Sequence, residues 1–203
     1  MDLDLEEIDR SMTFHPSEAC VVSCGTVTID PAACKVLLIW NRHLNIYQLP
    51  KGRKNIGEDM LSAALRETYE ETGVHATPLR LKIATRATPP SDKDEDEGGN
   101  GGDVGLRPTR EVTEGRLSTE FIGCCRYPDP QSSTPADKVV FYYAAIADSA
   151  VPRGAGTPRD RKKLKEVWAP AAEAATLLRF RAEADIVRKA LEDARRSGYQ
   201  MAG

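Results

Sequence analysis

The sequence has no long hydrophobic run, no excess of positive charge and no secretory leader. Its apolar stretches, such as 36–40, are strand-sized and far below the roughly 18 residues of a membrane-spanning helix. The formal charge is −3, which argues against a general nucleic-acid binder. The start, 1–7, is acidic and lacks the basic and apolar regions of a signal peptide. We therefore expect an intracellular protein, cytoplasmic or also nuclear, without membrane or nucleic-acid partners; the oligomeric state stays open.

The sequence also lacks paired cysteines. The five cysteines are odd in number and none forms a CxxC pair, so neither a disulfide framework nor a zinc site is indicated. Free cysteine is among the most buried residue types. We therefore expect all five to be buried thiols: Cys20, Cys24, Cys34, Cys124 and Cys125.

Apolar periodicity predicts a single domain over 19–197, between an N-terminal tail (1–18) and a C-terminal tail (198–203). The strands that we expect are 19–29, 35–40, 81–88, 119–127 and 138–146, the last two paired as a hairpin. The helices that we expect are 58–72, ending at Gly73, 171–179 and 183–196. Residues 91–116 are acidic and glycine-rich without period, and we expect disorder there. The segment 152–165 carries six cations against one acid, and is either a solvated loop or a phosphate-recognition segment.

Three glutamates on the helix over 58–72 carry the chemistry. Glu67, Glu70 and Glu71 stand at i, i+3 and i+4, where like charges destabilise a helix by about 0.2–0.5 kcal/mol per pair unless a cation intervenes. Carboxylates are hard oxygen ligands suited to Mg²⁺, with Mn²⁺ as the other choice, shared with substrate phosphates. We call these three residues the glutamate triad, and they predict phosphate chemistry.

Residues around the triad fit the same chemistry. Arg66 adjoins the triad and Glu58 precedes it by two helical turns, so the two could pair and orient the ligands. A predicted loop before the helix supplies backbone N–H groups and the cations Lys51, Arg53 and Lys54, while Gly52 lets the backbone approach an anion or metal closely.

The pattern Gly52-x5-Glu58-x7-Arg66-Glu67-x-x-Glu70-Glu71-x-Gly73 resembles the Nudix box in every fixed position. Thr68 is a soft departure, because the family usually has a larger aliphatic residue there. The resemblance implies an α/β/α sandwich with a mixed β-sheet, and Trp168-Ala-Pro170 resembles the start of the family's late helix.

The resemblance also implies Mg²⁺-dependent hydrolysis of a phosphoanhydride. Glu67 and Glu71 would ligate the metal with the Gly52 carbonyl, and Glu70 would be the general base or a further ligand, the roles among the three being open. Arg66 and Glu58 would orient them. A base outside the box, Glu120 or Glu166, is the other possibility.

The segment Leu49-Pro50-Lys51-Gly52 is similar to diadenosine polyphosphate hydrolases and to diphosphoinositol polyphosphate phosphohydrolases. The resemblance implies a small-molecule polyphosphate substrate, most simply a diadenosine polyphosphate, bound by Lys51, Arg53, Arg42, Lys54 and Tyr47. Aromatic faces for adenine could come from Tyr127, Phe141 or Tyr143. A diphosphoinositol substrate would instead use the cations of 152–165. A silent binding module and an enzyme acting on capped RNA are the remaining alternatives.

Overall fold

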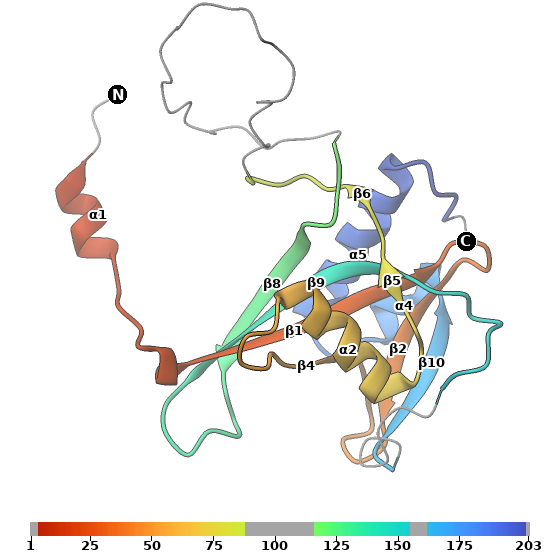
Figure 1. Cartoon of the computed structure of the whole chain (residues 1–203), viewed down its shortest axis with the longest axis horizontal. Helices are drawn as coiled ribbons and strands as arrows, with labels where there is room; N and C mark the ends of the chain where they lie inside the picture. Colours follow the sequence, from red (N-terminus) through yellow and green to blue (C-terminus); the bar gives the residue numbers. More distant parts are fainter. Residues whose placement is uncertain (1–3, 88–115, 155–161, 202–203) are drawn as a thin grey trace, which may run out of the picture.

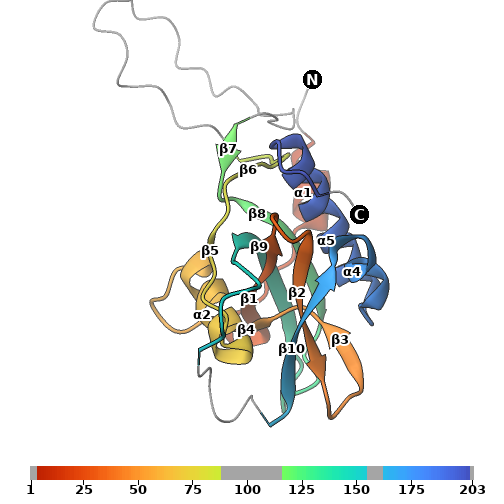
Figure 2. The same cartoon turned by 90° about the vertical axis from the view of Figure 1, so that its right-hand side faces the viewer.

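The computed structural model describes residues 4–87, 116–154 and 162–201. Within these ranges, one sheet of eight strands carries helix α2 on one face and helices α4 and α5 on the other (Figure 1, Figure 2). This arrangement confirms the expected α/β/α sandwich with a mixed sheet. No helix in the described ranges has the length and apolar character needed to cross a membrane.

The bounds of the elements follow the chain. The strands are β1 (Cys20–Asp30), β2 (Lys35–Asn41), β3 (Ile46–Gln48), β4 (Lys51–Arg53), β5 (Thr77–Pro78), β6 (Leu81–Lys82), β7 (Leu117–Ser118), β8 (Phe121–Pro128), β9 (Asp137–Ile146) and β10 (Leu164–Pro170). The helices are α1 (Leu5–Ser11), α2 (Met60–Thr72), α4 (Ala171–Leu177) and α5 (Arg181–Arg196), with a 3-10 turn, η1 (Ser17–Ala19).

Strand β1 is the centre of the sheet. It pairs in parallel with β9 over ten residues, from Cys20 opposite Asp137 to Ile29 opposite Ile146, and antiparallel with β2 and β4. The path of the sheet is β10-β2-β1-β9-β5, with β3 beside β2 and β8 beside β9. Because β1 is covered on both faces, its buried part is a continuous run of small and β-branched residues without alternation.

The two faces of the sheet hold separate apolar cores. On the α2 face, Cys24 and Tyr143 pack against Ala63 and Ala64. On the opposite face, a larger core joins the sheet to α4 and α5 and includes Ile186, Ala190 and Ala194 of α5. The alternation along β9 assigns Val140, Tyr142 and Ala144 to this second face.

Helix α2 differs slightly from its prediction. It begins at Met60, because the Asp59 carboxylate caps it by accepting from the Ser62 N–H at 2.9 Å. Glu58 therefore precedes the helix instead of lying in its first turn. The helix ends as expected at Gly73, whose φ of 76° is the left-handed conformation that favours glycine.

Several predicted elements need correction. The strand expected over 81–88 is reduced to Leu81–Lys82, which pairs with β7; the apolar residues that suggested it, Leu81 and Ile83, are both buried against the core. The short strands β3, β4, β5 and β7 were not expected. The hairpin of β8 and β9 is present, with a bulge between Phe121 and Gly123. Of the expected disordered segment, residues 91–115 lie outside the described residues.

The basic segment is only partly a loop. Leu164 and Lys165 belong to β10, so the loop prediction is wrong there, and residues 155–161 lie outside the described ranges. The cysteine prediction holds for Cys24 alone. Cys20, Cys34 and Cys125 are half-buried, and Cys124 is exposed because it projects from a strand that pairs on one side only, with β9.

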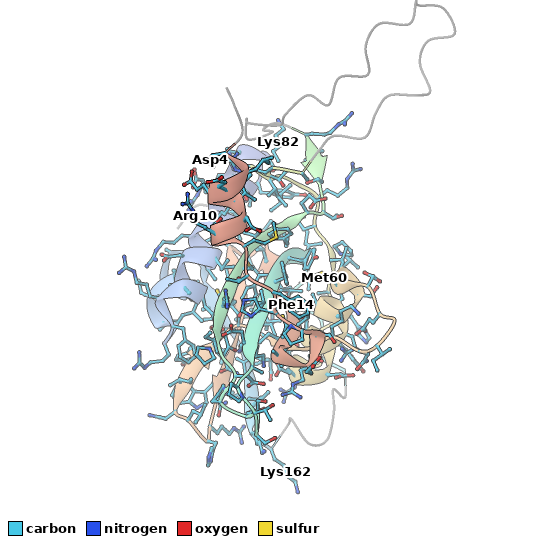
Figure 3. All side chains as sticks on the ribbon, turned by 90° about the vertical axis from the view of Figure 1, so that its left-hand side faces the viewer. Asp4, Arg10, Phe14, Met60, Lys82 and Lys162 are labelled. Atoms are coloured by element: carbon cyan, nitrogen blue, oxygen red, sulfur yellow. The ribbon has the colours of Figure 1, made fainter. Side chains whose placement is uncertain are left out.

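The two ends of the chain differ. Helix α1 buries no residue and stands clear of the sheet (Figure 1), and Phe14 after it is 88% exposed (Figure 3). The expected C-terminal tail is not free at its start: Met201 is only 2% exposed and belongs to the main core, and Tyr199 packs against it.

Candidate active site

The predicted loop over 51–54 is mostly a strand. Its residues Lys51–Arg53 form β4, which pairs antiparallel with β1, Ser23 standing opposite Arg53 and Gly25 opposite Lys51. Gly52 faces α2 so closely that an added Cβ would lie 1.8 Å from Oε2 of Glu67. Glycine is therefore required here by close approach to a carboxylate.

Arg66 is the hub of the site. Its Nε and Nη2 donate to the two oxygens of Glu58 at 2.8 and 3.0 Å, and its Nη1 donates to Glu67 at 2.7 Å and Glu70 at 3.0 Å. Nη2 also donates to the carbonyl of Arg53 at 2.9 Å. The guanidinium thus joins the residue before α2, two triad members and β4. The pairing proposed from the sequence between Arg66 and Glu58 is present.

Glu58 and Arg66 each stabilise the charged form of the other. The hydrogen bonds from Arg66, followed by the Asn55 N–H, hold the pKa of Glu58 below its ordinary value. In return, the hydrogen bond to Glu58 is the main reason that the pKa of Arg66 is raised above its ordinary value. Glu58 and Arg66 are therefore both ionised at neutral pH.

The side chain of Glu71, the third member of the triad, contacts the backbone of β4. Oε2 of Glu71 accepts from the Lys51 N–H at 2.9 Å. Glu67 and Glu71 therefore border Gly52 and Lys51, while the Glu70 side chain is 35% exposed at the rim. Oxygen donors beside a glycine without Cβ suit a hard divalent cation. In the described residues no three acidic, His or Cys side chains form a complete ligand set on their own, so a cation would need further oxygens from water or phosphate.

The two acids considered as bases outside the box have other surroundings. Glu166 on β10 accepts from the Arg153 guanidinium, in a segment that packs on the end of α2, where the Gly154 N–H donates to the Gly73 carbonyl at 2.7 Å. Glu120 lies just before β8 near Tyr143, whose pKa is raised to about 12 chiefly by burial and secondarily by charges that include Glu120.

A cavity of about 750 Å³ opens on the other face of the sheet, next to β4. Its walls come from β3, β4, β8, β9 and the start of α5, and they are largely apolar. Aromatic faces come from Tyr127, Tyr142 and Phe180. The lining residues with charged side chains are Lys51, Arg126, Arg179, Arg181 and Glu183.

Only one of the five predicted substrate-binding residues lines this cavity. That residue is Lys51, whose Nζ lies 3.5 Å from a carboxylate oxygen of Glu183. The others are placed elsewhere: Arg53 donates to the buried Asp129 at 3.0 Å, Lys54 donates to the Asn55 carbonyl, Arg42 is exposed in the turn between β2 and β3, and Tyr47 packs on Trp40 with ring centroids 4.6 Å apart.

Of the three aromatic residues named for adenine, only Tyr127 lines the cavity. Phe141 meets Phe121 edge to face at 5.3 Å, and Tyr143 is buried beneath α2. The reason is alternation along β9, which directs odd-numbered residues 141 and 143 toward α2.

Sequence reasoning missed two polar residues on the cavity's face of the sheet. Lys138 lies on β9, opposite Tyr127 of β8. It stands two residues before Val140, so its side chain is on the same face of the sheet as that of Lys51. Burial, together with the charge of Lys51, lowers its pKa. Ser23, directly across β1 from Val140, is fully buried and its hydroxyl has no hydrogen-bond partner in the described structure. The alternation with Val140 was the available signal for Lys138; Ser23 had none.

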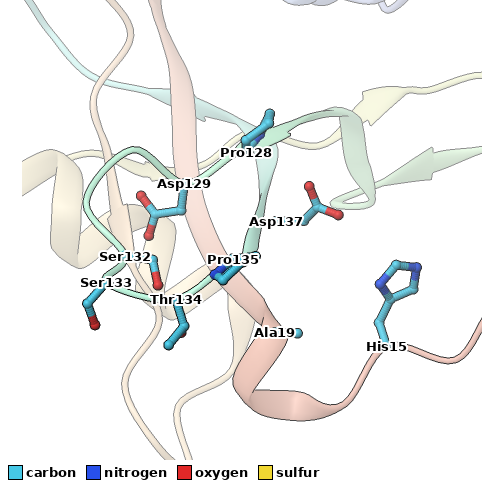
Figure 4. Close-up of a pocket in the computed structure, with 10 residues that line it drawn as sticks. His15, Ala19, Pro128, Asp129, Ser132, Ser133, Thr134, Pro135 and Asp137 are labelled. Atoms are coloured by element: carbon cyan, nitrogen blue, oxygen red, sulfur yellow. The ribbon is translucent and has the colours of Figure 1, made fainter.

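A second hollow, of about 510 Å³, lies under the loop between β8 and β9 (Figure 4). Asp129, Ser132 and Thr134 of the loop border it, opposite His15 and Ala19 of the N-terminal segment. Asp129 also binds Arg53, which links this loop to β4.

Residues 21–101 match the model of the NUDIX domain. Among curated proteins, none matches the chain. Solved structures with a similar fold include the Ap4A hydrolase of C. elegans, at 17% identity and a TM-score of 0.46, covering 84% of this chain and 95% of that one. They also include the dihydroneopterin triphosphate pyrophosphohydrolase of E. coli, at 16% identity and a TM-score of 0.45, covering 83% of this chain and 92% of that one. A NUDIX hydrolase from Nitrosomonas europaea matches at 13% identity and a TM-score of 0.47, covering 85% and 88%.

The matched segment contains the whole pattern from Gly52 to Gly73, folded around one arginine as described above. The intact motif and the match to the family model identify residues 21–101 as Nudix-domain sequence.

Proposed function

We propose that the chain is a Mg²⁺-dependent pyrophosphohydrolase of nucleoside polyphosphates, with a diadenosine polyphosphate as its preferred substrate. One observation carries the proposal: the Arg66-centred carboxylates and an aromatic-lined cavity flank the same short strand, β4. A substrate with a charged chain and a flat apolar end would span both.

In this proposal Glu67 and Glu71, with the Gly52 carbonyl, hold the metal, and Glu70 accepts a proton from the attacking water. A bound divalent cation would supply charge neutralisation on the phosphates and a lower pKa for water. The Glu70 side chain is 35% exposed and accepts a hydrogen bond from Arg66 at 3.0 Å, which orients its carboxylate. Glu58 holds Arg66 by a two-point contact, so both act as positioning residues.

Cations of the cavity face would bind the phosphate chain. Lys51 lies at the junction of metal site and cavity, because its N–H contacts Glu71 and its side chain lines the cavity. Lys138 is half-buried, burial and the nearby charge of Lys51 lower its pKa, and no ion pair satisfies its ammonium in the described residues. An anionic phosphate oxygen would compensate the Lys138 ammonium and meet that of Lys51.

The adenine would lie between Tyr127 and Phe180 at the mouth of the cavity. Phe180 is 47% exposed, and its ring lies in the turn between α4 and α5. Offset stacking on such rings is worth about 0.5–1.5 kcal/mol beyond buried area. This support favours a nucleotide over an inositol.

Diphosphoinositol remains the second candidate, because Arg126, Arg179 and Arg181 border the cavity. The part of the basic segment that the structure describes argues against it. Lys162, Lys163 and Lys165 lie at or next to β10, which pairs with β2 and not with β4, and none of the three lines the cavity. All three are exposed, and their positions do not suit the binding of an inositol substrate at the cavity.

The test is phosphate release from four substrates with Mg²⁺, with and without EDTA: diadenosine tetraphosphate, a diphosphoinositol polyphosphate, ADP-ribose and capped RNA. We expect EDTA-sensitive turnover with the highest kcat/KM on the dinucleotide. Preference for the inositol substrate would overturn the substrate assignment, and a folded protein silent on all four would indicate a binding module.

Glu70→Gln tests the role of the base within the same assay. We expect kcat to fall about 10²–10⁴-fold with the fold intact, because the change removes the proton acceptor at constant volume. Glu173→Gln, at an exposed position of α4, is the matched control and should retain full activity. Equal rates for the two variants would reject Glu70 as the base.

A further inference from the structure

Glu183 is a buried carboxylate that the Nudix motif does not contain. It lies in the first turn of α5, more than a hundred residues from the box, and is only 4% exposed. Its Oε2 accepts from the Leu49 N–H at 3.0 Å, and its Oε1 accepts from the Tyr142 hydroxyl at 2.9 Å. Glu183 and Tyr142 both line the cavity.

Packing alone does not account for an ionised group at this place. Burying a carboxylate is costly unless a cation and good hydrogen bonds accompany it, and the two neutral donors could be served by an amide. Lys51 is the cation within ion-pair distance of Glu183 in the described structure, at 3.5 Å, and its side chain is itself only 13% exposed. The start of α5 contributes its dipole to the same negative charge.

Lys51 connects the two sides of the site. Its backbone N–H binds Glu71 on the α2 side, while its ammonium points to Glu183 on the α5 side. Glu183 also fixes the Leu49 N–H two residues earlier, so it holds the strand segment at two points. A displacement of Glu183 would therefore move the Lys51 ammonium and change the approach to Gly52.

We propose that Glu183 is a positioning residue of the substrate site, which holds the Lys51 ammonium at the junction of cavity and metal site so that it meets the phosphate chain. The inference rests on the proposed function, and it adds a residue of α5 to a site otherwise built from β4 and α2. Glu183 acts through Lys51 and does not touch the reacting atoms.

A double-mutant cycle tests this role. Glu183→Gln should raise KM for diadenosine tetraphosphate about tenfold, with kcat within about twofold, because one charge-assisted contact to the phosphate chain is misplaced. Lys51→Met should raise KM at least as much. In the Lys51→Met background, Glu183→Gln should then have no further effect on KM. Glu192→Gln, an exposed acid on the same helix, is the matched control.

A purely structural Glu183 would give a different result. Glu183→Gln would then lower the melting temperature in both the wild-type and the Lys51→Met backgrounds. Its effect on KM would either add to that of Lys51→Met or be absent, and each of these two KM results would overturn the proposal. If Glu183→Gln does not fold, Glu183→Asp retains the charge and withdraws it by one methylene, and the same cycle applies.

The proposed function can fail separately. If the wild-type protein hydrolyses no polyphosphate, calorimetry with inorganic tripolyphosphate in EDTA measures binding by the same four proteins. Coupled losses of affinity would uphold Lys51 and Glu183 as an anion-binding unit, and additive losses, or equal affinities in all four proteins, would overturn it.

Discussion

Gly52 and Arg66 show how single residues make the site. Because Gly52 has no side chain, the backbone of β4 lies against the Glu67 carboxylate. Arg66 donates hydrogen bonds to three carboxylates and one carbonyl. Neither residue would react with substrate. Both decide where the carboxylates of α2 stand, which in a metal site matters as much as the ligands themselves.

Gly52→Ala should weaken metal use without unfolding the protein. The added Cβ would meet the Glu67 carboxylate at 1.8–2.5 Å, so the flexible end of that side chain must move away from β4. We expect the Mg²⁺ concentration for half-maximal activity to rise about tenfold or more, in line with losses at metal-supporting positions. A titration of activity with Mg²⁺ measures it.

The control for this change is Gly198→Ala. Gly198 has a φ of 94° and open space around it, so alanine should cost roughly 1 kcal/mol of stability and leave the Mg²⁺ titration unchanged. An unchanged titration for Gly52→Ala as well would mean that Glu67 does not need its place beside β4.

The lowered pKa of Glu58 predicts that the stability of the folded protein depends on pH. Its pKa in the folded protein lies below the ordinary value of 4.5 because of Arg66, so its contribution is fully present above about pH 4.5 and is lost as pH falls through the lower folded value. Glu58→Gln should therefore be less stable than wild type at pH 7, and the gap should close in acid. Urea unfolding at pH 7, 5, 4 and 3 measures the gap, with Glu192→Gln as the exposed control; a gap that widens toward acid would contradict the sign.

At the scale of elements, α2 is joined to the sheet by hydroxyl groups as well as by apolar packing. The Thr68 hydroxyl donates to the Ala64 carbonyl at 2.8 Å and lies 2.7 Å from the Thr26 hydroxyl, which in turn lies 2.7 Å from that of Thr28. All three threonines are fully buried. The departure from the usual aliphatic residue at position 68 is therefore matched by polar partners on β1.

Thr68→Val should be more costly than its size suggests. It removes one of the two hydroxyl partners of the buried Thr26, and the loss of a buried hydrogen bond costs about 0.5–1.5 kcal/mol. Thr176→Val is the matched control, because Thr176 makes a similar bond to the Glu173 carbonyl on the exposed face of α4 and should change stability by less than about 0.5 kcal/mol. Urea unfolding compares the two; equal costs would show that the hydroxyl chain does not hold α2.

The elements that the sequence predicted well are those with a strong period. Helix α2, helix α5 and strands β1, β2, β8 and β9 have long apolar patterns and clear boundary residues, such as Gly73. The three-residue strands β3 and β4 have no such pattern, since their pairing is decided by β2 and β1. The same holds for the site: Arg66 and the triad come from one helix, whereas tertiary packing alone brings Glu183 to the cavity and Lys138 near Lys51.

At the scale of the whole molecule, the two termini have opposite relations to the core. Helix α1 and Phe14 contribute no buried side chain, whereas Met201 closes the core at the far end of α5. We therefore propose a domain that starts near η1 and extends at least to Met201, which is four residues beyond the boundary expected from the sequence.

Two truncations test this boundary. Removal of residues 1–13 should change the free energy of unfolding by less than about 0.5 kcal/mol and leave kcat/KM unchanged. Removal of residues 199–203 should cost about 2–5 kcal/mol, because it takes Met201 out of the core. Thermal and urea unfolding of both proteins measure the difference, and a larger loss from the N-terminal deletion would place α1 within the domain.

The parallel pairing of β1 with β9 has a consequence for synthesis. β1 is made early, but its partner begins only at Asp137, so β1 must wait for more than half of the chain to leave the ribosome. α2 packs on β1 and β9, and the strand that bears Gly52 pairs with β1. During synthesis the complete glutamate motif therefore exists well before β9 completes the part of the sheet on which α2 packs. We expect hydrolytic activity to appear in one late step, after β9 has emerged.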